Sequence, residues 1–388
     1  MRPTSCEQIH LSGISGTVGT VNTVEAAGDH GRGIDSVPTV DPIVLDFFLA
    51  SAQVVLEEGG WIHPGTRLVS DGSGLTVACA ADVGEPLLRI PRSCFVPMGE
   101  LRWADAEYLE LTDGLAELHP AAMEILLSEV GMHNQRGALA TIRREHPQLA
   151  ADITPELTRA VRAFRPSFRT SDATPATVFW GNRCFRLPGT AGTGFVPTLL
   201  PLVDLLNHDH GASTGALDSE GFRVQVCPSP GSDHCCVDYG YDRDAIGMAV
   251  VYGFSDEHNP WAHSAPLTVH VAAVGDVTVT GRGRDAAGAL RPVHAEHASS
   301  TLTLSRISFH RHQSLEDLFR EVATATELSA KEIERVISAV AAANLDLLQQ
   351  IADSVSTDST SGSSLAATKT LVAAARVQMA TIHAMLAS

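Results

Sequence analysis

The stretch of sequence that decides the fold is Leu199-Leu200-Pro201-Leu202-Val203-Asp204-Leu205-Leu206-Asn207-His208. Its apolar run predicts a buried strand, with Asp204 inside the run and Asn207-His208 directly after it. Buried polar side chains must find hydrogen-bond partners, because otherwise they destabilise the fold. The segment therefore predicts either a structural polar network at the end of a strand or a functional site in the loop that follows.

Two tyrosines precede glycines further along the chain. Tyr239-Gly240 ends one segment and Tyr252-Gly253-Phe254 ends another, in a chain that has four tyrosines in all. Glycine after tyrosine allows a positive φ or a close backbone approach. A Tyr-Gly pair is also common where a strand enters a turn, so each pair becomes informative only together with the Asn207-His208 segment.

Taken in chain order, these segments belong to one series of motifs. The series is Gly72-x-Gly74, Asn182-Arg183-Cys184-Phe185, Pro201-x-x-Asp204-x-x-Asn207-His208, Tyr239-Gly240 and Tyr252-Gly253-Phe254-x-x-x-x-Asn259. It closely resembles a SET-domain protein methyltransferase, and more narrowly the class typified by the Rubisco large-subunit lysine methyltransferase. The opening Glu58-Gly59-Gly60-Trp61-Ile62-His63-Pro64 also fits this class, and the resemblance covers residues 41–388.

The resemblance implies S-adenosylmethionine as the cofactor and assigns residues to its binding. By this resemblance the backbone at Gly72 and Gly74 lies against the cofactor, and Arg183 pairs with the cofactor's carboxylate. A guanidinium group matches a carboxylate in geometry and charge. Asn207 and His208 are expected to hydrogen-bond the cofactor with side chain and backbone.

The resemblance also implies the residues that act on the substrate. Tyr252 is expected to be the catalytic tyrosine, and Tyr239 to line the substrate channel and help to hold the target side chain. Asp204 would brace the Asn207-His208 segment or border the channel, and Phe254 would pack beside the cofactor or the channel wall. No metal is expected in this chemistry.

The expected reaction is transfer of methyl groups to a lysine side chain of a protein substrate. An apolar channel favours the neutral amine that the transfer needs, because burial disfavours the charged form. Two alternatives stay open. In one, the methyl group goes to a histidine of a protein substrate. The other is an inactive SET-fold scaffold that binds a partner, suggested by the run Asp244-Ala245-Ile246-Gly247, where the family usually shows a Ser-Asn-Ala-Glu-like run.

The expected fold class is α+β: a β-rich SET domain with a helical insertion, followed by an all-helical C-terminal lobe. We expect a disordered or loosely attached arm over residues 1–40 and a SET domain over 41–310. We place the helical insert at about 101–175, and a helical lobe that serves as a platform for the protein substrate over 311–388.

Local patterns predict the elements of this fold. Helices are expected over Asp41–Glu58, within Leu101–Phe168, where Met123, Leu126, Leu127 and Val130 form a stripe, and over Leu365–Leu386. Ser314 and Ser329 read as helix caps, and Leu315–Val322 and Ile333–Val340 show helical spacing. Strands are expected over residues 68–70, 75–79, 86–90, 198–204, 222–227, 234–239 and 267–273.

Composition limits the possible partners. The chain has 388 residues and a formal net charge of −18, which argues against a nucleic-acid binder and favours a protein substrate with a basic segment. No run of about 18 apolar residues is present, so we expect no membrane span. We expect a monomer.

Cysteine usage bears on the compartment and on metal binding. The seven cysteines form no Cys-x-x-Cys pair, which favours free thiols in a reducing intracellular compartment, the cytoplasm or nucleus rather than a plastid. A rival interpretation is a zinc site made by Cys227, His234, Cys235 and Cys236. Adjacent strand residues point to opposite faces, which disfavours this site.

Overall fold

The computed structural model describes residues 40–388 except 71–73, 152, 170–172, 190–193, 230, 241–242, 282–292, 299–300, 306 and 356–361. The arm expected over residues 1–40 thus lies outside the described residues, apart from Val40. The chain forms two compact units, each made of two stretches of sequence. Unit 1 comprises Met1–Leu139 and Arg183–Tyr241, and unit 2 comprises Ala140–Asn182 and Asp242–Ser388. The domain boundaries at residues 40 and 310 stay predictions.

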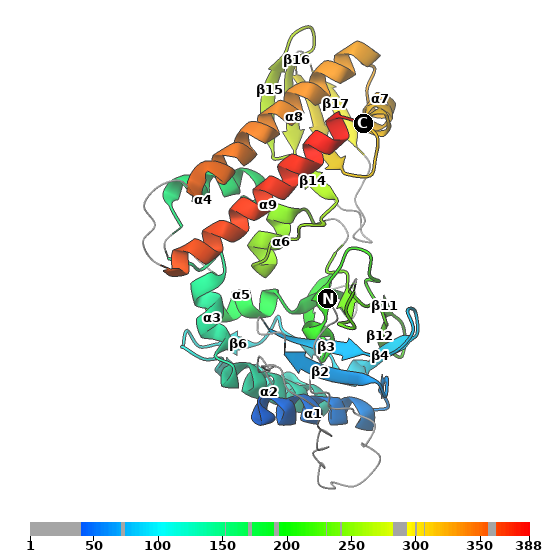
Figure 1. Cartoon of the computed structure of the whole chain (residues 1–388), viewed down its shortest axis with the longest axis vertical. Coiled ribbons are helices and arrows are strands. Elements are labelled where there is room, and N and C mark those ends of the chain that lie inside the picture. The colour runs from blue at the N-terminus through cyan, green and yellow to red at the C-terminus, as the bar shows by residue number, and fades with distance from the viewer. Residues whose placement is uncertain are drawn as a thin grey trace, which may run out of the picture. The chain divides into compact units, whose positions relative to one another are not determined.

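Two helices, α1 (Pro42–Glu57) and α2 (Pro120–Gln135), lie side by side in unit 1 (Figure 1). Asp41 begins α1, because its Oδ1 accepts a 2.8 Å hydrogen bond from the N–H of Ile43. The two helices approach so closely that a Cβ at Gly131 would lie 2.5 Å from the Phe47 ring. The helix predicted from Asp41 onward is therefore confirmed.

Short sheets make up the rest of unit 1. Their strands are β1 (Trp61–Ile62), β2 (Thr66–Ser70), β3 (Leu75–Cys79), β4 (Pro86–Pro91), β5 (Val96–Pro97), β6 (Arg102–Trp103), β7 (Leu111–Asp113), β8 (Cys184–Pro188), β9 (Phe195–Leu199), β10 (Asn207–His208), β11 (Ala216–Leu217), β12 (Gly221–Gln225) and β13 (Cys236–Val237). The sheets have the orders β1-β4-β12-β11, β2-β3, β5-β9-β8, β6-β7 and β10-β13. The strands predicted over 68–70, 75–79 and 86–90 are confirmed.

Two expectations about unit 1 are wrong. The chain after residue 101 is not yet helical: β6 pairs with β7, and the left-handed Gly114 (φ of 95°) separates them from α2. The strand predicted through Asp204 ends at Leu199. Leu202 has a φ of 66°, which turns the chain into the 3-10 helix η5 (Val203–Leu205), and Asp204 lies on this turn.

The buried face of α2 also differs from the predicted stripe. Leu127, a member of that stripe, is 53% exposed. The buried face instead includes Ser128, Glu129 and His133. Hydrophobic periodicity misplaces this face because three of its residues are polar and are buried in polar contacts.

Unit 2 is mostly helical. Its helices are α3 (Ala138–Glu145), which begins in unit 1, α4 (Pro155–Phe164), α5 (Pro175–Gly181), α6 (Ala245–Tyr252), α7 (Leu315–Ala325), α8 (Ala330–Ala352) and α9 (Gly362–Leu386). The predicted caps are confirmed, since Ser314 and Ser329 both form capping boxes. Helices α8 and α9 pack along each other (Figure 1).

A sheet packs against α8 in unit 2. The strands of this unit are β14 (Trp261–His263), β15 (Leu267–Val271), β16 (Gly275–Thr280), β17 (His294–Ala298), β18 (Thr301–Ser305) and β19 (Ser308–His310), in the orders β15-β16-β18-β17 and β14-β19. The predicted stripe Ile333, Val336, Ile337 and Val340 is fully buried. The fold is therefore α+β with a helical C-terminal part, as predicted. None of the described helices has the length and apolar character needed to cross a membrane.

Candidate functional site

The Asn207-His208 and Tyr239-Gly240 motifs come together in unit 1. Strand β10, which consists of Asn207 and His208, pairs in parallel with β13, so that Asn207 faces Cys236 and His208 faces Val237. Tyr239 follows two residues after β13. Two predicted site segments separated by some thirty residues of sequence are thereby placed next to each other.

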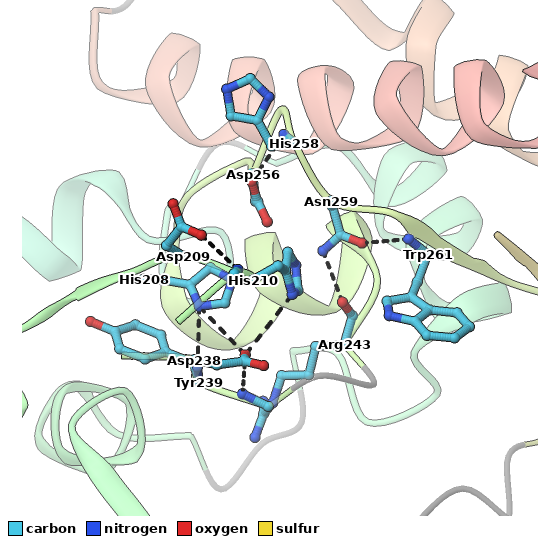
Figure 2. Close-up of polar contacts among 12 residues, drawn as sticks. His208, Asp209, His210, Asp238, Tyr239, Arg243, Asp256, His258, Asn259 and Trp261 are labelled. Carbon is cyan, nitrogen blue, oxygen red and sulfur yellow. Dashed lines mark hydrogen bonds and ion pairs between the residues drawn. The ribbon is translucent and has the colours of Figure 1, made fainter. Parts of the chain in front are cut away.

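Tyr239 is fixed at both ends. Its hydroxyl donates a 2.6 Å hydrogen bond to the carbonyl oxygen of Leu206, and its backbone N–H donates to His208 Nδ1 at 3.1 Å. The rings of Tyr239 and His208 lie 5.1 Å apart, centre to centre. Because Nδ1 accepts a hydrogen bond, the proton of a neutral His208 ring is on Nε2. Figure 2 shows this pair beside Asp238.

Asp238 organises the turn that follows. Its side chain is 4% exposed, and its Oδ1 lies 3.8 Å from His208 Nδ1 and 3.9 Å from His210 Nδ1. The same oxygen accepts a 2.9 Å hydrogen bond from the N–H of Gly240. Gly240 has a φ of 136°, so this position uses the conformational freedom that the Tyr-Gly pattern predicts.

Asp204 belongs to a buried polar cluster rather than to a strand. Its Oδ2 lies 3.8 Å from Nε2 of His133, and the same nitrogen lies 3.5 Å from Oε2 of Glu129. The side chains of Asp204, His133 and Glu129 are at most 1% exposed. Ser51 on α1 donates to Glu129 at 3.4 Å. The position of Asp204 suits the bracing role that the resemblance allows it.

The protonation of this cluster follows from its burial. Burial and the neighbouring Asp204 raise the pKa of Glu129 well above its usual value, and burial raises the pKa of Asp204 to about 7. Burial also lowers the pKa of His133, and the positive charge of Arg183 lowers it further. The cluster therefore prefers a neutral imidazole and at least one protonated carboxyl group.

Arg183 interacts electrostatically with the buried cluster and with Tyr239. Burial lowers the pKa of its guanidinium, while Asp204, Tyr239 and Glu129 raise it, in this order. Arg183 is the last residue before β8, at the start of the second stretch of unit 1. A guanidinium has five N–H donors, so it can interact with Asp204 and still offer donors to a carboxylate.

Of the two predicted cofactor glycines, one is described. Gly72 lies outside the described residues. Gly74 directly precedes β3, and a Cβ built on it would meet no atom within 4 Å. The same is true of Gly59 and Gly84, so the space at Gly74 does not by itself mark a binding site.

Tyr252 and Phe254 lie at the end of α6 in unit 2. Tyr252 is the last residue of the helix, and the guanidinium carbon of Arg243 lies 4.9 Å from its ring centre. The ring of Phe254 lies 6.2 Å from that of Tyr252. A cation over an aromatic face is attracted by the ring quadrupole, which helps to hold the tyrosine in place.

The turn after Tyr252 is held by the loop that follows α3. Gly253 has a φ of 79°, and a Cβ there would lie 2.7 Å from Cδ2 of His146. Nε2 of His146 lies 3.2 Å from the carbonyl oxygen of Val251, and Gln148 Nε2 donates to the carbonyl oxygen of Val250 at 3.1 Å. Burial lowers the pKa of His146 to about 4, so the imidazole stays neutral and donates from Nε2.

The altered run after Tyr239 begins α6. Asp244 caps this helix, because its Oδ1 accepts from the N–H of Gly247 at 2.7 Å and from the guanidinium of Arg165. Asn259, also in the predicted series, donates to the carbonyl oxygen of Arg243 at 2.8 Å and accepts from the N–H of Trp261 at 2.9 Å (Figure 2). Both residues thus shape the chain around α6, which gives the departure at Asp244 a structural reason.

Sequence reasoning misses four residues of these surroundings: Glu129, His133, Arg243 and His146. The spacing Glu129-x-x-x-His133 places a carboxylate and an imidazole on one face of a helix, and this pattern could have identified the first two. Arg243 and His146 contact the end of α6 only in the folded chain, and no local pattern predicts these contacts.

The zinc interpretation does not fit the described residues. Cys236 Sγ lies 2.8 Å from Ser229 Oγ, whereas Cys235 interacts with Cys79. Neighbouring cysteines thus face different partners, as expected for a strand. Within the described part of the chain, Cys227, His234, Cys235 and Cys236 do not form a group whose ligand atoms lie within 4.8 Å of one another.

No family model matches the chain, and no curated protein matches it. Several solved structures are similar to it, among them three of LSMT. The SET domain of LSMT bound to lysine and AdoHcy has 12% identity and a TM-score of 0.39, over 90% of this chain and 92% of that chain. Rubisco LSMT bound to sinefungin and monomethyllysine has 13% identity and a TM-score of 0.40, over 89% and 90%. Rubisco LSMT bound to AdoMet has 14% identity and a TM-score of 0.39, over 88% and 91%.

Proposed function

We propose that the chain is an S-adenosylmethionine-dependent protein N-methyltransferase that acts on a lysine side chain. The observation that carries the proposal is the double attachment of Tyr239 to the Asn207-His208 segment, through Leu206 and through His208. These are the two motifs that the sequence singles out, and the bonds use the side chains of Tyr239 and His208.

The residues of unit 1 are proposed to hold the cofactor. Arg183 supplies a positive charge for the cofactor's carboxylate, and Asn207 and His208 supply polar groups beside it. The backbone at Gly72 and Gly74 is proposed to lie against the cofactor. Asp204 positions Arg183 and the segment that leads to Asn207 through the buried cluster.

S-adenosylmethionine supplies a methyl group already activated by a positive sulfonium. The protein therefore has to align the acceptor and exclude water rather than activate the donor. Tyr252 is proposed as the catalytic residue, with its hydroxyl oxygen accepting from the target amine and orienting it. Tyr239 is proposed to line the channel, where its hydroxyl and the Leu206 carbonyl oxygen provide polar contacts, and Phe254 to supply an apolar wall.

The lysine target must be neutral when it reacts. An apolar channel lowers the pKa of an amine, because burial disfavours the charged form. The net charge of −18 supports a protein substrate whose target lies in a basic segment, since opposite charges steer association. The C-terminal helices α7 to α9 are proposed as the platform for that substrate, with the enzyme acting as a monomer.

Calorimetric titration with S-adenosylmethionine tests the proposal first. Saturable binding by the whole chain is expected, and Arg183→Gln should weaken it. Labelling of a cell lysate with methyl-tritiated cofactor should then transfer label to protein with the wild type but not with Tyr252→Phe. Label recovered as methyl-histidine would identify a histidine target instead, and a folded chain without cofactor binding would favour a scaffold.

A further inference from the structure

Two cysteines are diagonal neighbours on one face where a loop segment extends the edge of β3 in unit 1. The N–H of Cys79 donates to the carbonyl oxygen of Asp233 at 3.0 Å, and the N–H of Cys235 donates to that of Val77 at 2.8 Å. These bonds flank the antiparallel bridge between Ala78 and His234. Because side chains alternate along a strand, Cys79 and Cys235 lie on the same face, opposite to Ala78 and His234.

The Cys79 thiol has a base and a second thiol as neighbours. Its Sγ lies 3.2 Å from Nδ1 of His63, and Cys235 lies diagonally across the bridge on the same face. The N–H of Gly65 donates to the same Nδ1 at 3.0 Å, so this nitrogen carries a lone pair. The other ring nitrogen of His63 lies 3.6 Å from Oε2 of Glu85. His63 can therefore accept the Cys79 proton on Nδ1 in exchange for the Gly65 hydrogen bond, with Glu85 placed to stabilise the resulting imidazolium.

The two thiols differ in acidity as a consequence. Interaction with the Cys235 thiol lowers the pKa of Cys79 to about 6, against the effect of burial, and His63 and Thr66 lower it as well. The same interaction raises the pKa of Cys235. Burial raises the pKa of Cys94, which serves as a contrast, to about 11. These pKa shifts favour a thiolate at Cys79 and a thiol at Cys235, which is the arrangement of an attacking and a resolving cysteine.

We propose that Cys79 and Cys235 form a site of reversible oxidation, at which a hydroperoxide converts the two thiols into a disulfide. The Cys79 thiolate attacks one oxygen of hydrogen peroxide, an S–O bond forms, and the O–O bond breaks. The departing hydroxide takes a proton from the His63 imidazolium and leaves as water. The sulfur of Cys235 then attacks that of Cys79, the S–S bond forms, and the S–O bond breaks. The second hydroxide leaves as water with the Cys235 proton, so two thiols lose two electrons and the peroxide gains two.

Solvent reaches this site through His63, its proposed proton acceptor. The His63 side chain keeps 21% of its surface exposed and Glu85 keeps 49%, although Cys79 itself is 2% exposed. Small uncharged reagents, hydrogen peroxide among them, are therefore the class that fits. The pair also joins two segments of the proposed cofactor site: β3 begins after Gly74, and Cys235 precedes β13, which pairs with Asn207-His208. Only this last connection rests on the proposed function; the oxidation itself does not.

Peroxide treatment followed by peptide mapping tests the pair without cofactor or substrate. Whole reduced protein is exposed to hydrogen peroxide at pH 7, remaining thiols are blocked, and disulfide-linked peptides are identified by mass spectrometry. The expected product is a Cys79–Cys235 link that dithiothreitol reverses. In the reduced protein, iodoacetamide should modify Cys79 at least about tenfold faster than Cys94. A link between other cysteines, or equal rates at Cys79 and Cys94, would overturn the proposal.

Single variants separate the roles of the two thiols. In Cys235→Ser, Cys79 should stop at the sulfenic acid and be captured by dimedone, whereas Cys79→Ser should leave Cys235 unreactive. Cys236→Ser is the matched control, since its thiol faces Ser229 instead, and it should form the Cys79–Cys235 link like the wild type. His63→Gln should slow alkylation of Cys79 at pH 7. Dimedone labelling of Cys235 in place of Cys79 would contradict the assignment.

Discussion

The Tyr239 hydroxyl donates a 2.6 Å hydrogen bond to the carbonyl oxygen of Leu206, the residue directly before Asn207. This bond joins the side chain of one motif to the backbone of another, and the N–H of Tyr239 adds a second bond to His208. The ring of Tyr239 is therefore held in one orientation before any ligand arrives. A group that is positioned in advance loses little conformational freedom on binding.

Removing this hydroxyl should affect activity more than stability. Tyr239→Phe leaves the Leu206 carbonyl without its donor, which is expected to cost about 0.5–1.5 kcal/mol in the free energy of unfolding. Methyl transfer should fall at least about tenfold, because the channel loses a fixed polar group. Urea unfolding and turnover with labelled cofactor measure the two effects. Full turnover in a folded variant would remove Tyr239 from the site.

Tyr252→Phe should abolish methyl transfer and leave cofactor affinity within about twofold. The substitution keeps the ring that Arg243 contacts at 4.9 Å, so α6 is expected to end as in the wild type. Only the hydroxyl that is proposed to orient the target amine is lost. Calorimetry and a transfer assay on the same preparation separate binding from chemistry, and unchanged turnover would show that Tyr252 has no catalytic role.

Arg183→Gln should weaken S-adenosylmethionine binding by about 1.5–3 kcal/mol, the range of a hydrogen bond to a charged group. The change also leaves the buried carboxyl groups of Asp204 and Glu129 without their positive neighbour, so stability should fall. The double variant Arg183→Gln, Asp204→Asn restores the charge balance and should recover stability but not affinity. Recovery of both would show that Arg183 acts only through the fold.

Glu129 makes the stability depend on pH in an unusual direction. Its pKa in the folded state lies well above the value of 4.5 that holds without burial, so the folded chain binds this proton more tightly than the unfolded chain. Its contribution to stability is therefore present at low pH and is lost as the pH rises above about 4.5. Asp204, with a pKa of about 7 in the fold, acts in the same sense.

Glu129→Gln, which imitates the protonated side chain, should flatten this dependence. The change in slope of the free energy of unfolding should approach about 1.4 kcal/mol per pH unit, the value for one proton. Urea titrations from pH 5 to 8 measure it. Glu124→Gln, exposed on the same helix, should keep the wild-type slope. An identical slope in Glu129→Gln would show that this carboxyl is ionised in the fold.

Gly253→Ala should destabilise unit 2 by more than about 2 kcal/mol. A side chain at a φ of 79° costs about 1–2 kcal/mol, and the new Cβ would lie 2.7 Å from the His146 ring. Methyl transfer should fall as well, because the turn sets the end of α6 at Tyr252. Gly181→Ala is the control, since a Cβ there meets nothing within 4 Å and stability should be retained. Equal melting temperatures would contradict the role of the turn.

Much of the fold can be predicted from local sequence. Asp41 and Ser314 each predict a helix, because their side chains accept hydrogen bonds from N–H groups within three residues. Ser329 predicts α8 as well, where its own N–H and hydroxyl donate to the Glu332 side chain. Periodic apolar residues likewise identify the buried face of α8. Such features depend on residues close together in the sequence, so the sequence alone predicts them.

The arrangement of the candidate site is less accessible to sequence reasoning. The sequence predicts a strand at Asp204, because no local pattern indicates that Leu202 adopts a left-handed φ. The buried face of α2 is misjudged since Glu129 and His133 are stabilised by partners elsewhere in unit 1. The two errors have different causes: the first is a backbone turn that no local pattern marks, and the second is a pair of buried polar residues that hydrophobic periodicity does not register.

The interleaving of the two units has a consequence during synthesis on the ribosome. A chain emerges from its N-terminus, and domains generally fold as units in that order. Residues 140–182 emerge before unit 1 is complete at residue 241, yet their partners belong to residues 242–388. The apolar face of α4, with Leu157, Val161 and Phe164, therefore stays uncovered until the C-terminal helices are made. Early termination of translation would leave this face exposed to aggregation and to chaperones.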